Sequence, residues 1–221
     1  MKIASRNGSR RRSAPDGAEP GRSDTYDFLL TVTAKLLTEK DSVDFSLSEI
    51  ALRSGMSAAL VQYHFGSKDG LLMALLERGT AKAADQLVAL EKMPVSVSER
   101  LRIHVKGLVS AYMHAPYINR LLHHIMSSGD EARAIRTSEL FITPIANFYA
   151  RLIDQGVEEG VFRPIAPMHL YFMLVGACDQ LVARRSALQH AFGVRELTEE
   201  MGQNFCDTLY HIISTGLAAE K

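Results

Sequence analysis

The side chains best suited to recognising another molecule lie in the segment 46–68. A short helix is expected there over about 58–64, and its N-terminal residues would enter a partner's groove first. The amide of Gln62 can form two hydrogen bonds with adenine in the major groove of DNA, whereas an alanine can contact only a thymine methyl group. The side chains expected on the exposed side of this helix, with Leu60 and Val61 assigned to the core, are Ser57, Ala58, Ala59, Gln62 and Tyr63.

Groups suited to holding DNA phosphates flank this helix. Ser46 opens the preceding short helix, whose N-terminus would face the sugar-phosphate backbone. Ser67 and Lys68 begin the next helix, where free backbone amides and the helix dipole attract an anion and the lysine adds a positive charge. The chemistry predicted for the segment is therefore the binding of double-stranded DNA.

Other groups of reactive side chains are less informative. His123 and His124 suggest a metal site, but neighbouring helix positions point about 100° apart and cannot readily hold one ion together. No histidine belongs to a convincing cluster of carboxylates or thiols, so no metal ion and no other cofactor is expected. The chain also lacks a nucleophile elbow, a phosphate-binding glycine loop and a paired-carboxylate signature, so an enzyme is not expected.

Two very short helices joined at a glycine must position the DNA-contacting groups. Ser46 and Glu49 form a capping box that opens the first helix, and Ser57 can cap the second. Gly55 supplies the backbone freedom that ends the first helix and turns the chain. Apolar residues on one side of each helix hold both onto a shared small core, which is the pattern of a helix-turn-helix that reads the major groove.

This stretch resembles the DNA-binding domain of the tetracycline-repressor (TetR) family. The resemblance covers about residues 24–80 and rests on Ser46-Leu47-x-Glu49-Ile50-Ala51, on Gly55-Met56-Ser57 and on Tyr63-His64-Phe65-Gly66-Ser67-Lys68-Asp69-Gly70-Leu71-Leu72. A weaker match is Gly156-x-x-x-Gly160-Val161-Phe162-Arg163.

The resemblance implies that Tyr63 and His64 contact DNA phosphates, although His64 can equally be a partly buried structural residue. Many relatives have Lys-Gly or Lys-Thr where this chain has Ala58 and Ala59, and Gln62 replaces a common tyrosine. The operator sequence therefore does not follow from the resemblance.

Charge is unevenly distributed along the 221 residues, which together carry no net formal charge. Residues 1–23 hold six basic and two acidic side chains, a net charge of +4, whereas residues 24–78 hold five basic and eight acidic ones, a net charge of −3. The few cations of the DNA-binding segment must therefore lie close to the DNA phosphates, or the basic N-terminus must supply further cations. Residues 1–22 have almost nothing to bury and are expected to be disordered, either as an arm that touches DNA or as a terminus without a role.

Cysteine usage and hydropathy predict a cytoplasmic location. Cys178 and Cys206 fall in helical, apolar surroundings, which favours buried thiols over a redox pair. No run approaches the roughly 18 apolar residues needed to span a bilayer, and no hydrophobic signal segment follows the basic N-terminus. No membrane partner is expected.

The chain is predicted to be all-α, with about nine helices and no convincing strand of alternating polarity. The predicted division is a disordered basic arm over 1–22, a three-helix DNA-binding head over 23–70 and a helical ligand-binding and dimerisation body over 71–221. The helices expected after the head cover 68–92, from Ser98 to near 115, 117–128, 130–159 with a kink or a new start at Pro144, 167–190 and 197–217.

The last two helices carry apolar stripes that must be hidden, either in the core of the chain itself or against a symmetry mate. In the TetR family such a pair builds a four-helix dimer interface, so the resemblance implies a homodimer that binds two half-sites about one helical turn apart, or a multiple of it. The residues assigned to this interface are Leu174, Cys178, Leu181, Met201, Phe205, Leu209 and Ile212.

The resemblance also implies that the middle helices enclose a pocket for a small, partly apolar effector. The inward-facing candidates, each of which could instead be ordinary core, are His104, Leu108, Tyr112, Leu122, Met126, Phe141, Phe148 and Met173.

The predicted function is a ligand-responsive, homodimeric transcriptional regulator, most simply a repressor that binds a palindromic operator. An effector in the body would move the long helix that begins near Lys68 and spoil the spacing of the two heads. The alternative is a helical DNA-binding or protein-interaction module without a small-molecule effector, whose pocket its own side chains would fill.

Overall fold

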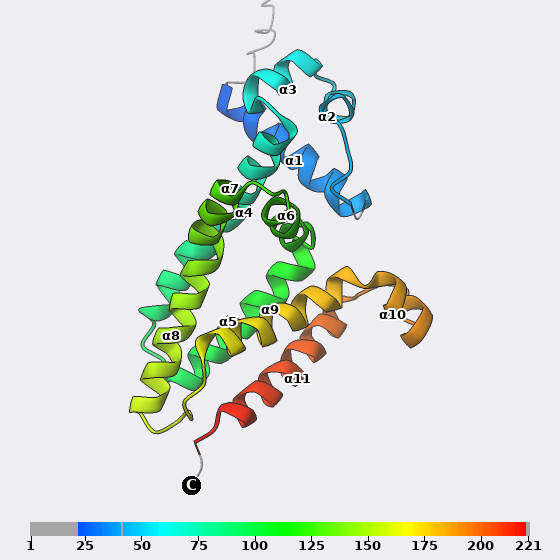
Figure 1. Cartoon of the computed structure of the whole chain (residues 1–221). Coiled ribbons are helices and arrows are strands. Elements are labelled where there is room, and N and C mark those ends of the chain that lie inside the picture. The colour runs from blue at the N-terminus through cyan, green and yellow to red at the C-terminus, as the bar shows by residue number, and fades with distance from the viewer. Residues whose placement is uncertain (1–21, 41, 220–221) are drawn as a thin grey trace, which may run out of the picture.

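The computed structural model describes residues 22–40 and 42–219, and nearly all of these are helical (Figure 1). The all-α prediction is confirmed, since the β structure of the described part is limited to an isolated bridge between Phe162 and Ala218. The helices are α1 (Arg22–Lys40), α2 (Leu47–Ser54), α3 (Ala58–Phe65), α4 (Lys68–Glu91), α5 (Val97–His114), α6 (Tyr117–Met126), α7 (Glu131–Thr137), α8 (Thr143–Glu158), α9 (Pro167–Ala183), α10 (Arg185–Phe192) and α11 (Glu199–Leu217), with a π-helical segment, η1 (Ser138–Ile142), before α8.

The first three helices and the start of α4 build a small head at one end of the molecule (Figure 1). The predicted serine caps are present: Oγ of Ser46 accepts from the backbone N–H of Glu49 at 3.2 Å, and Oγ of Ser57 accepts from that of Leu60 at 3.2 Å. Gly55 ends α2 with a φ of 70°, which favours glycine. Fully buried side chains that join the four helices include Leu29, Leu36, Ile50, Val61 and Leu71.

The long helix α4 runs from the head into the body (Figure 1). Its N-cap is Ser67, whose Oγ accepts from the N–H of Gly70 at 3.0 Å. A Cβ at position 70 would lie 2.1 Å from the carbonyl oxygen of Phe65, so a larger residue cannot fit without a shift of the backbone. Close backbone contact therefore determines how α4 leaves α3.

The apolar core of the head continues into the body. Arg120 of α6 donates to the carbonyl oxygen of Leu37 in α1 at 3.2 Å, which ties α6 to the first helix. The side chains of α6 and η1 that share the buried cluster of the head are Tyr117, Leu121, Ile125 and Phe141.

A second core lies in the body, where α5, α8, α9 and α11 pack together with the end of α4. Leu101, Tyr149 and Leu174 are among its fully buried members. Both cysteines are free and buried, as predicted, and burial raises the pKa of the Cys178 thiol to about 12. No helix of the described residues is long and apolar enough to cross a membrane.

The helices outnumber the predicted nine because two expected helices are interrupted. In segment 130–159 the N–H of Thr143 bonds to the carbonyl of Ser138, which closes the π turn of η1. Pro144, which has no N–H, follows in the first turn of α8, so the new start at this proline is confirmed. Segment 167–190 is broken at Arg184, where a ψ of 48° is not helical, and α10 projects beyond α9 and α11 as a separate helix (Figure 1).

Candidate DNA-binding surface and body cavities

The outer face of α3 carries the side chains predicted to read bases. Val61 and Phe65 are buried, and this orients the helix so that its other side faces solvent. The exposed residues there are Ser57, Ala58, Ala59, Gln62 and Tyr63, the last with 64% of its surface accessible. Their contact with DNA stays a prediction.

The amide of Gln62 is already engaged in the unbound chain. Its Nε2 donates to the carbonyl oxygen of Gly66, the residue with a φ of 70° that ends α3. Recognition of a base by Gln62 would require the amide to leave this acceptor. The sequence contained a signal for this bond in the glycine four residues after the glutamine, which reverses the chain and brings its carbonyl within reach.

His64 packs against aromatic neighbours on α1 and α3. Its ring centre lies 6.1 Å from that of Tyr26 and 5.5 Å from that of Tyr63, and Tyr26 also lies 4.8 Å from Phe65. The half-buried ring of His64 therefore has a structural role, which is compatible with a phosphate contact at its accessible edge. Tyr26 was not among the predicted site residues.

Several cations of the head are already paired with carboxylates. Lys40 lies 2.8 Å from Glu49, and Arg53 lies 2.5 Å from Glu39. Lys68 has no carboxylate partner among the described residues; its Nζ lies 4.8 Å from the centre of the Phe45 ring. Its charge remains available to a phosphate. Ser46 is exposed, so its hydroxyl group is also available to a phosphate. The predicted arm over 1–22 lies almost wholly outside the described residues.

Some residues predicted to line an effector pocket are packed in the two cores. Nε2 of His104 lies 2.8 Å from the hydroxyl of Tyr149, and the rings of His104 and Phe148 are 4.7 Å apart. Burial lowers the pKa of His104 to about 4, so its imidazole is neutral at pH 7. Phe141 belongs to the core of the head. An inward-facing apolar pattern does not distinguish a cavity wall from a filled core, which is why these assignments differ from the structure.

A cavity of about 440 Å³ lies between α6 and α9; we call it the α6–α9 cavity. Leu122 and Met126, two of the predicted pocket residues, form part of its wall. Three other predicted residues, Leu108, Tyr112 and Met173, do not line it. The remaining wall comes from Asn119, His123, Ile142, Tyr171, Phe172, Val175, Gly176 and Asp179.

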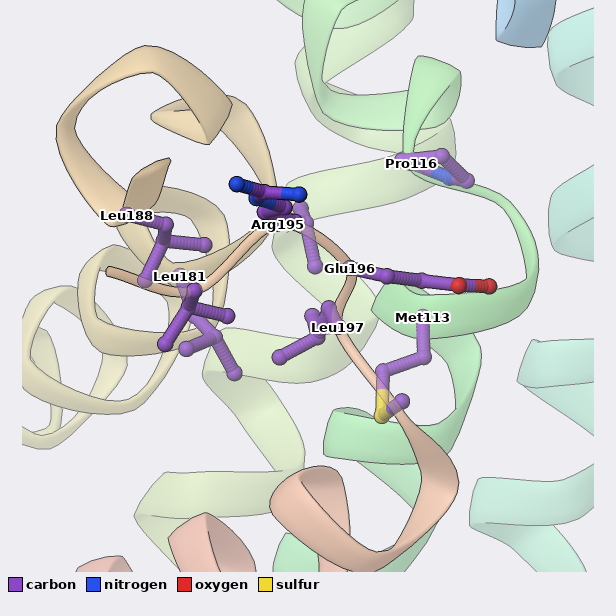
Figure 2. A pocket seen from close by; sticks show the side chains of 9 residues that line it. Met113, Pro116, Leu181, Leu188, Arg195, Glu196 and Leu197 are labelled. Carbon is purple, nitrogen blue, oxygen red and sulfur yellow. The ribbon is translucent and has the colours of Figure 1, made fainter. Parts of the chain in front are cut away.

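A second cavity, of about 270 Å³, lies where α10 and the loop before α11 meet the ends of α5 and α9. Figure 2 shows Leu181 and Leu188 on one side of it and Met113 and Pro116 on the other, with the side chain of Glu196 extending between the latter two. Leu181, predicted for the dimer interface, thus lines a cavity within its own chain. The break at Arg184 that creates this site is marked by no proline or glycine.

The predicted dimer stripes are divided between the core and the surface. Leu174 and Cys178 are buried in the core of their own chain, and Leu209 is only 8% exposed, so these three have little surface to offer a partner. Their assignment to the interface is corrected, because α5 and α8 already cover that side of α9 and α5 covers that side of α11. Met201 and Phe205 are half-buried, and Ile212 is 61% exposed.

Two short helices joined by a left-handed glycine, with an exposed second helix and a larger helical body, define a helix-turn-helix DNA-binding protein. Residues 29–75 match the sequence model of bacterial regulatory proteins of the tetR family. Residues 94–221 match the model of the tetracyclin repressor-like C-terminal domain. The chain belongs to the TetR family of transcriptional regulators.

Individual relatives agree with this family. The HTH-type transcriptional regulator BetI of Rhizobium meliloti (strain 1021) is 30% identical over 100 residues, a match that spans 45% of this chain and 48% of BetI. AibR, solved in complex with isovaleryl coenzyme A and operator DNA, has a TM-score of 0.68 at 17% identity, over 85% of this chain and 96% of AibR. A TetR family regulator of Marinobacter aquaeolei VT8 has a TM-score of 0.63 at 20% identity, over 90% of this chain and 98% of that one.

Family membership makes the chain a DNA-binding transcriptional regulator and not an enzyme. Among the described residues, no three potential metal ligands gather at one place. The individual contacts to DNA, effector and partner stay predictions.

Proposed function

We propose that the chain is a homodimeric repressor that binds a palindromic operator and is released by a small, partly apolar effector. In this proposal residues 23–70 form the DNA-binding head, residues 71–221 form the ligand-binding and dimerisation body, and the arm over 1–22 precedes them. In this proposal the protein acts in the cytoplasm, together with its DNA operator.

The observation that carries the proposal is that α6 and η1 serve both the head and the α6–α9 cavity. Leu121 and Ile125 lie in the core of the head, whereas the next residue after each, Leu122 and Met126, lines the cavity. The same division holds in η1, where Phe141 belongs to the core of the head and Ile142 to the cavity wall. A molecule in the cavity would therefore press on elements whose other side is packed against the DNA-binding head.

Ion pairs provide a second link between body and head. Arg133 of α7 lies 2.5 Å from Asp69 in the first turn of α4. Arg136 lies 3.8 Å from Glu77, eight positions further along α4. A shift of α7 and η1 would pull on the start of α4, next to the turn that positions α3. AibR, which has this fold, has been solved in complex with isovaleryl coenzyme A and operator DNA, and this supports the proposed pairing of a ligand site with a DNA site.

Dimerisation is proposed through the surfaces of α9 and α11 that their own chain leaves open. Ile212 of α11 and Met168 of α9 are large apolar side chains with most of their surface accessible. Burying such side chains against a symmetry mate stabilises each protomer by about 1.5–3 kcal/mol per residue before association costs.

Selection of DNA from a random-sequence library by the full chain tests the proposal. Inverted repeats are expected, each bound by two protomers in analytical ultracentrifugation. Enrichment of unrepeated half-sites, each bound by one protomer, would contradict the dimeric part. Small molecules that release the protein from the selected DNA are expected to bind in the α6–α9 cavity.

One observation favours the second candidate, a DNA-binding module without an effector. His104, Phe141 and Phe148 are packed by neighbouring side chains, so the interior expected to hold a ligand is filled there. Replacing Leu122 by Trp would fill the α6–α9 cavity as well. Under the repressor proposal this variant binds DNA but resists release, whereas under the second candidate no molecule releases either protein.

A further inference from the structure

The α6–α9 cavity has one formally charged side chain in its wall, that of Asp179. Its carboxylate accepts from the amide of Gln180, the next residue, at 3.3 Å. No lysine or arginine of the described residues pairs with it, and none lines the cavity. The wall therefore holds a carboxylate that no lysine or arginine of the described residues balances.

The negative charge reaches the neighbouring interior. Burial and then the carboxylate of Asp179 raise the pKa of Tyr112, so its hydroxyl stays protonated and adds no second negative charge. Met126 and His123 in the wall belong to the last turn of α6, the end at which the helix dipole is negative. The field in the cavity thus favours a positively charged ligand.

Two aromatic rings stand beside the carboxylate. Tyr171 and Phe172 both line the cavity, with ring centres 5.2 Å apart and planes at 87° to each other. Aromatic faces attract ammonium groups, most strongly where water is partly excluded. The other wall residues, such as Leu122, Ile142 and Val175, supply apolar surface.

We propose that the α6–α9 cavity binds an organic monocation, an ammonium group carried on an apolar body. The carboxylate of Asp179 would neutralise the ammonium, Tyr171 and Phe172 would contact it through their rings, and the aliphatic wall would cover the apolar part. A volume of about 440 Å³ is sufficient for a small drug-sized molecule. The same charge disfavours anionic effectors in this cavity. The proposal rests on the proposed function only in taking the cavity as the effector site.

Three probes of the same apolar body and different charge test the inference. These are 2-phenylethylammonium, 2-phenylethanol and 3-phenylpropanoate, titrated into the full chain at pH 8 and followed by NMR. The cation is expected to bind at least tenfold more tightly than the alcohol, and the acid more weakly than both. Asp179→Asn, which preserves shape, should reduce cation binding about tenfold and leave alcohol binding unchanged. Asp154→Asn, an exposed carboxylate of α8 outside the cavity, is the matched control and should bind like the natural chain.

The outcomes separate this inference from the proposed function. Binding of the alcohol with no preference for the cation, or equal cation binding by Asp179→Asn, overturns the inference and leaves the cavity as an effector site. Binding of none of the probes overturns the inference, while the proposed function is tested separately by release of the protein from the selected DNA. Phe172→Leu keeps an apolar side chain at an exposed position, so it should fold normally and lose several-fold in cation affinity. Unchanged cation affinity in this variant would remove the aromatic part of the site.

Discussion

The amide of Gln62 donates to the carbonyl of Gly66 in the unbound chain, while Ala58 and Ala59 beside it present only methyl groups. We predict that Gln62→Ala relaxes selectivity at one base pair per half-site, at a cost of about 1–3 kcal/mol for the preferred base. Competition between operators that differ at single base pairs measures this. An equal loss on every sequence would mean that Gln62 acts by holding the turn at Gly66.

Lys68 is predicted to contact a phosphate, because its charge has no carboxylate partner in the described part of the chain and lies where α4 begins. Lys68→Ala should weaken binding to all DNA sequences alike and reduce the slope of log K against log salt by about one. Lys35→Ala, which removes an exposed lysine of α1 near Glu39, is the control and should leave the slope unchanged. A slope that responds equally to both variants would refute a specific phosphate contact.

His104 is predicted to make the body sensitive to acid. Burial lowers its pKa from 6.5 to about 4, so the unfolded chain takes up the proton before the folded one does. The stability that this provides is complete above pH 6.5 and is lost as the pH falls toward 4, by about 1.4 kcal/mol per pH unit and about 3 kcal/mol in all. Urea unfolding at pH 7 and pH 4.5 should show a smaller acid loss for His104→Gln than for the natural chain. Equal losses would assign the acid sensitivity to other groups.

At the scale of secondary-structure elements, the junction of α3 and α4 has no room for a side chain at Gly70. A Cβ at Gly70 would lie 2.1 Å from the backbone oxygen of Phe65, which cannot rotate away as a side chain could. Gly70→Ala should therefore cost about 1–3 kcal/mol of stability and shift α3, with a loss of DNA binding. Both are measured on one protein sample, by urea unfolding and by fluorescence anisotropy with selected DNA.

The matched control is Gly107→Ala in the interior of α5, where a Cβ would have no heavy atom within 4 Å. This variant should stabilise the protein by up to about 1 kcal/mol, because alanine favours the helix. If Gly70→Ala behaved like Gly107→Ala, the α3–α4 turn would be more adaptable than its backbone contact implies.

At the scale of the whole molecule, the exposed side of α11 is predicted to meet a second copy of the chain. Ile212 is 61% exposed, so a charge there costs the isolated protomer little, but in a dimer the charge would be buried without a partner. Ile212→Glu should sediment as a monomer and lose tight operator binding. Ile135→Glu, which alters another exposed isoleucine on α7, should remain dimeric.

The choice of residue matters for this test. Leu209 was an equal candidate by periodicity, yet it packs against α5 within its own chain. Leu209→Glu would unfold the body, and its failure to dimerise would carry no information. If Ile212→Glu sediments as a dimer of unchanged stability, the interface lies on another surface.

The sequence by itself determined what depends on a few neighbouring residues. The caps of Ser46 and Ser57, the turn at Gly55 and the helix start at Pro144 all involve groups within five positions of one another, so residue type and spacing were sufficient to predict them. The helix-turn-helix and its exposed recognition face follow from these local features together with the apolar stripe of each short helix.

Only the tertiary structure decided what covers each stripe of the body. Periodicity shows that Leu174, Leu209 and Ile212 share apolar faces, but the packing of α5 and α8 buried the first two and left the third exposed. The α6–α9 cavity and the double role of α6 likewise arise from helices distant in sequence, whose approach depends on shape and not on local preference. An apolar stripe indicates that one side of a helix must be buried. Which element or partner buries it is determined by how the whole chain packs.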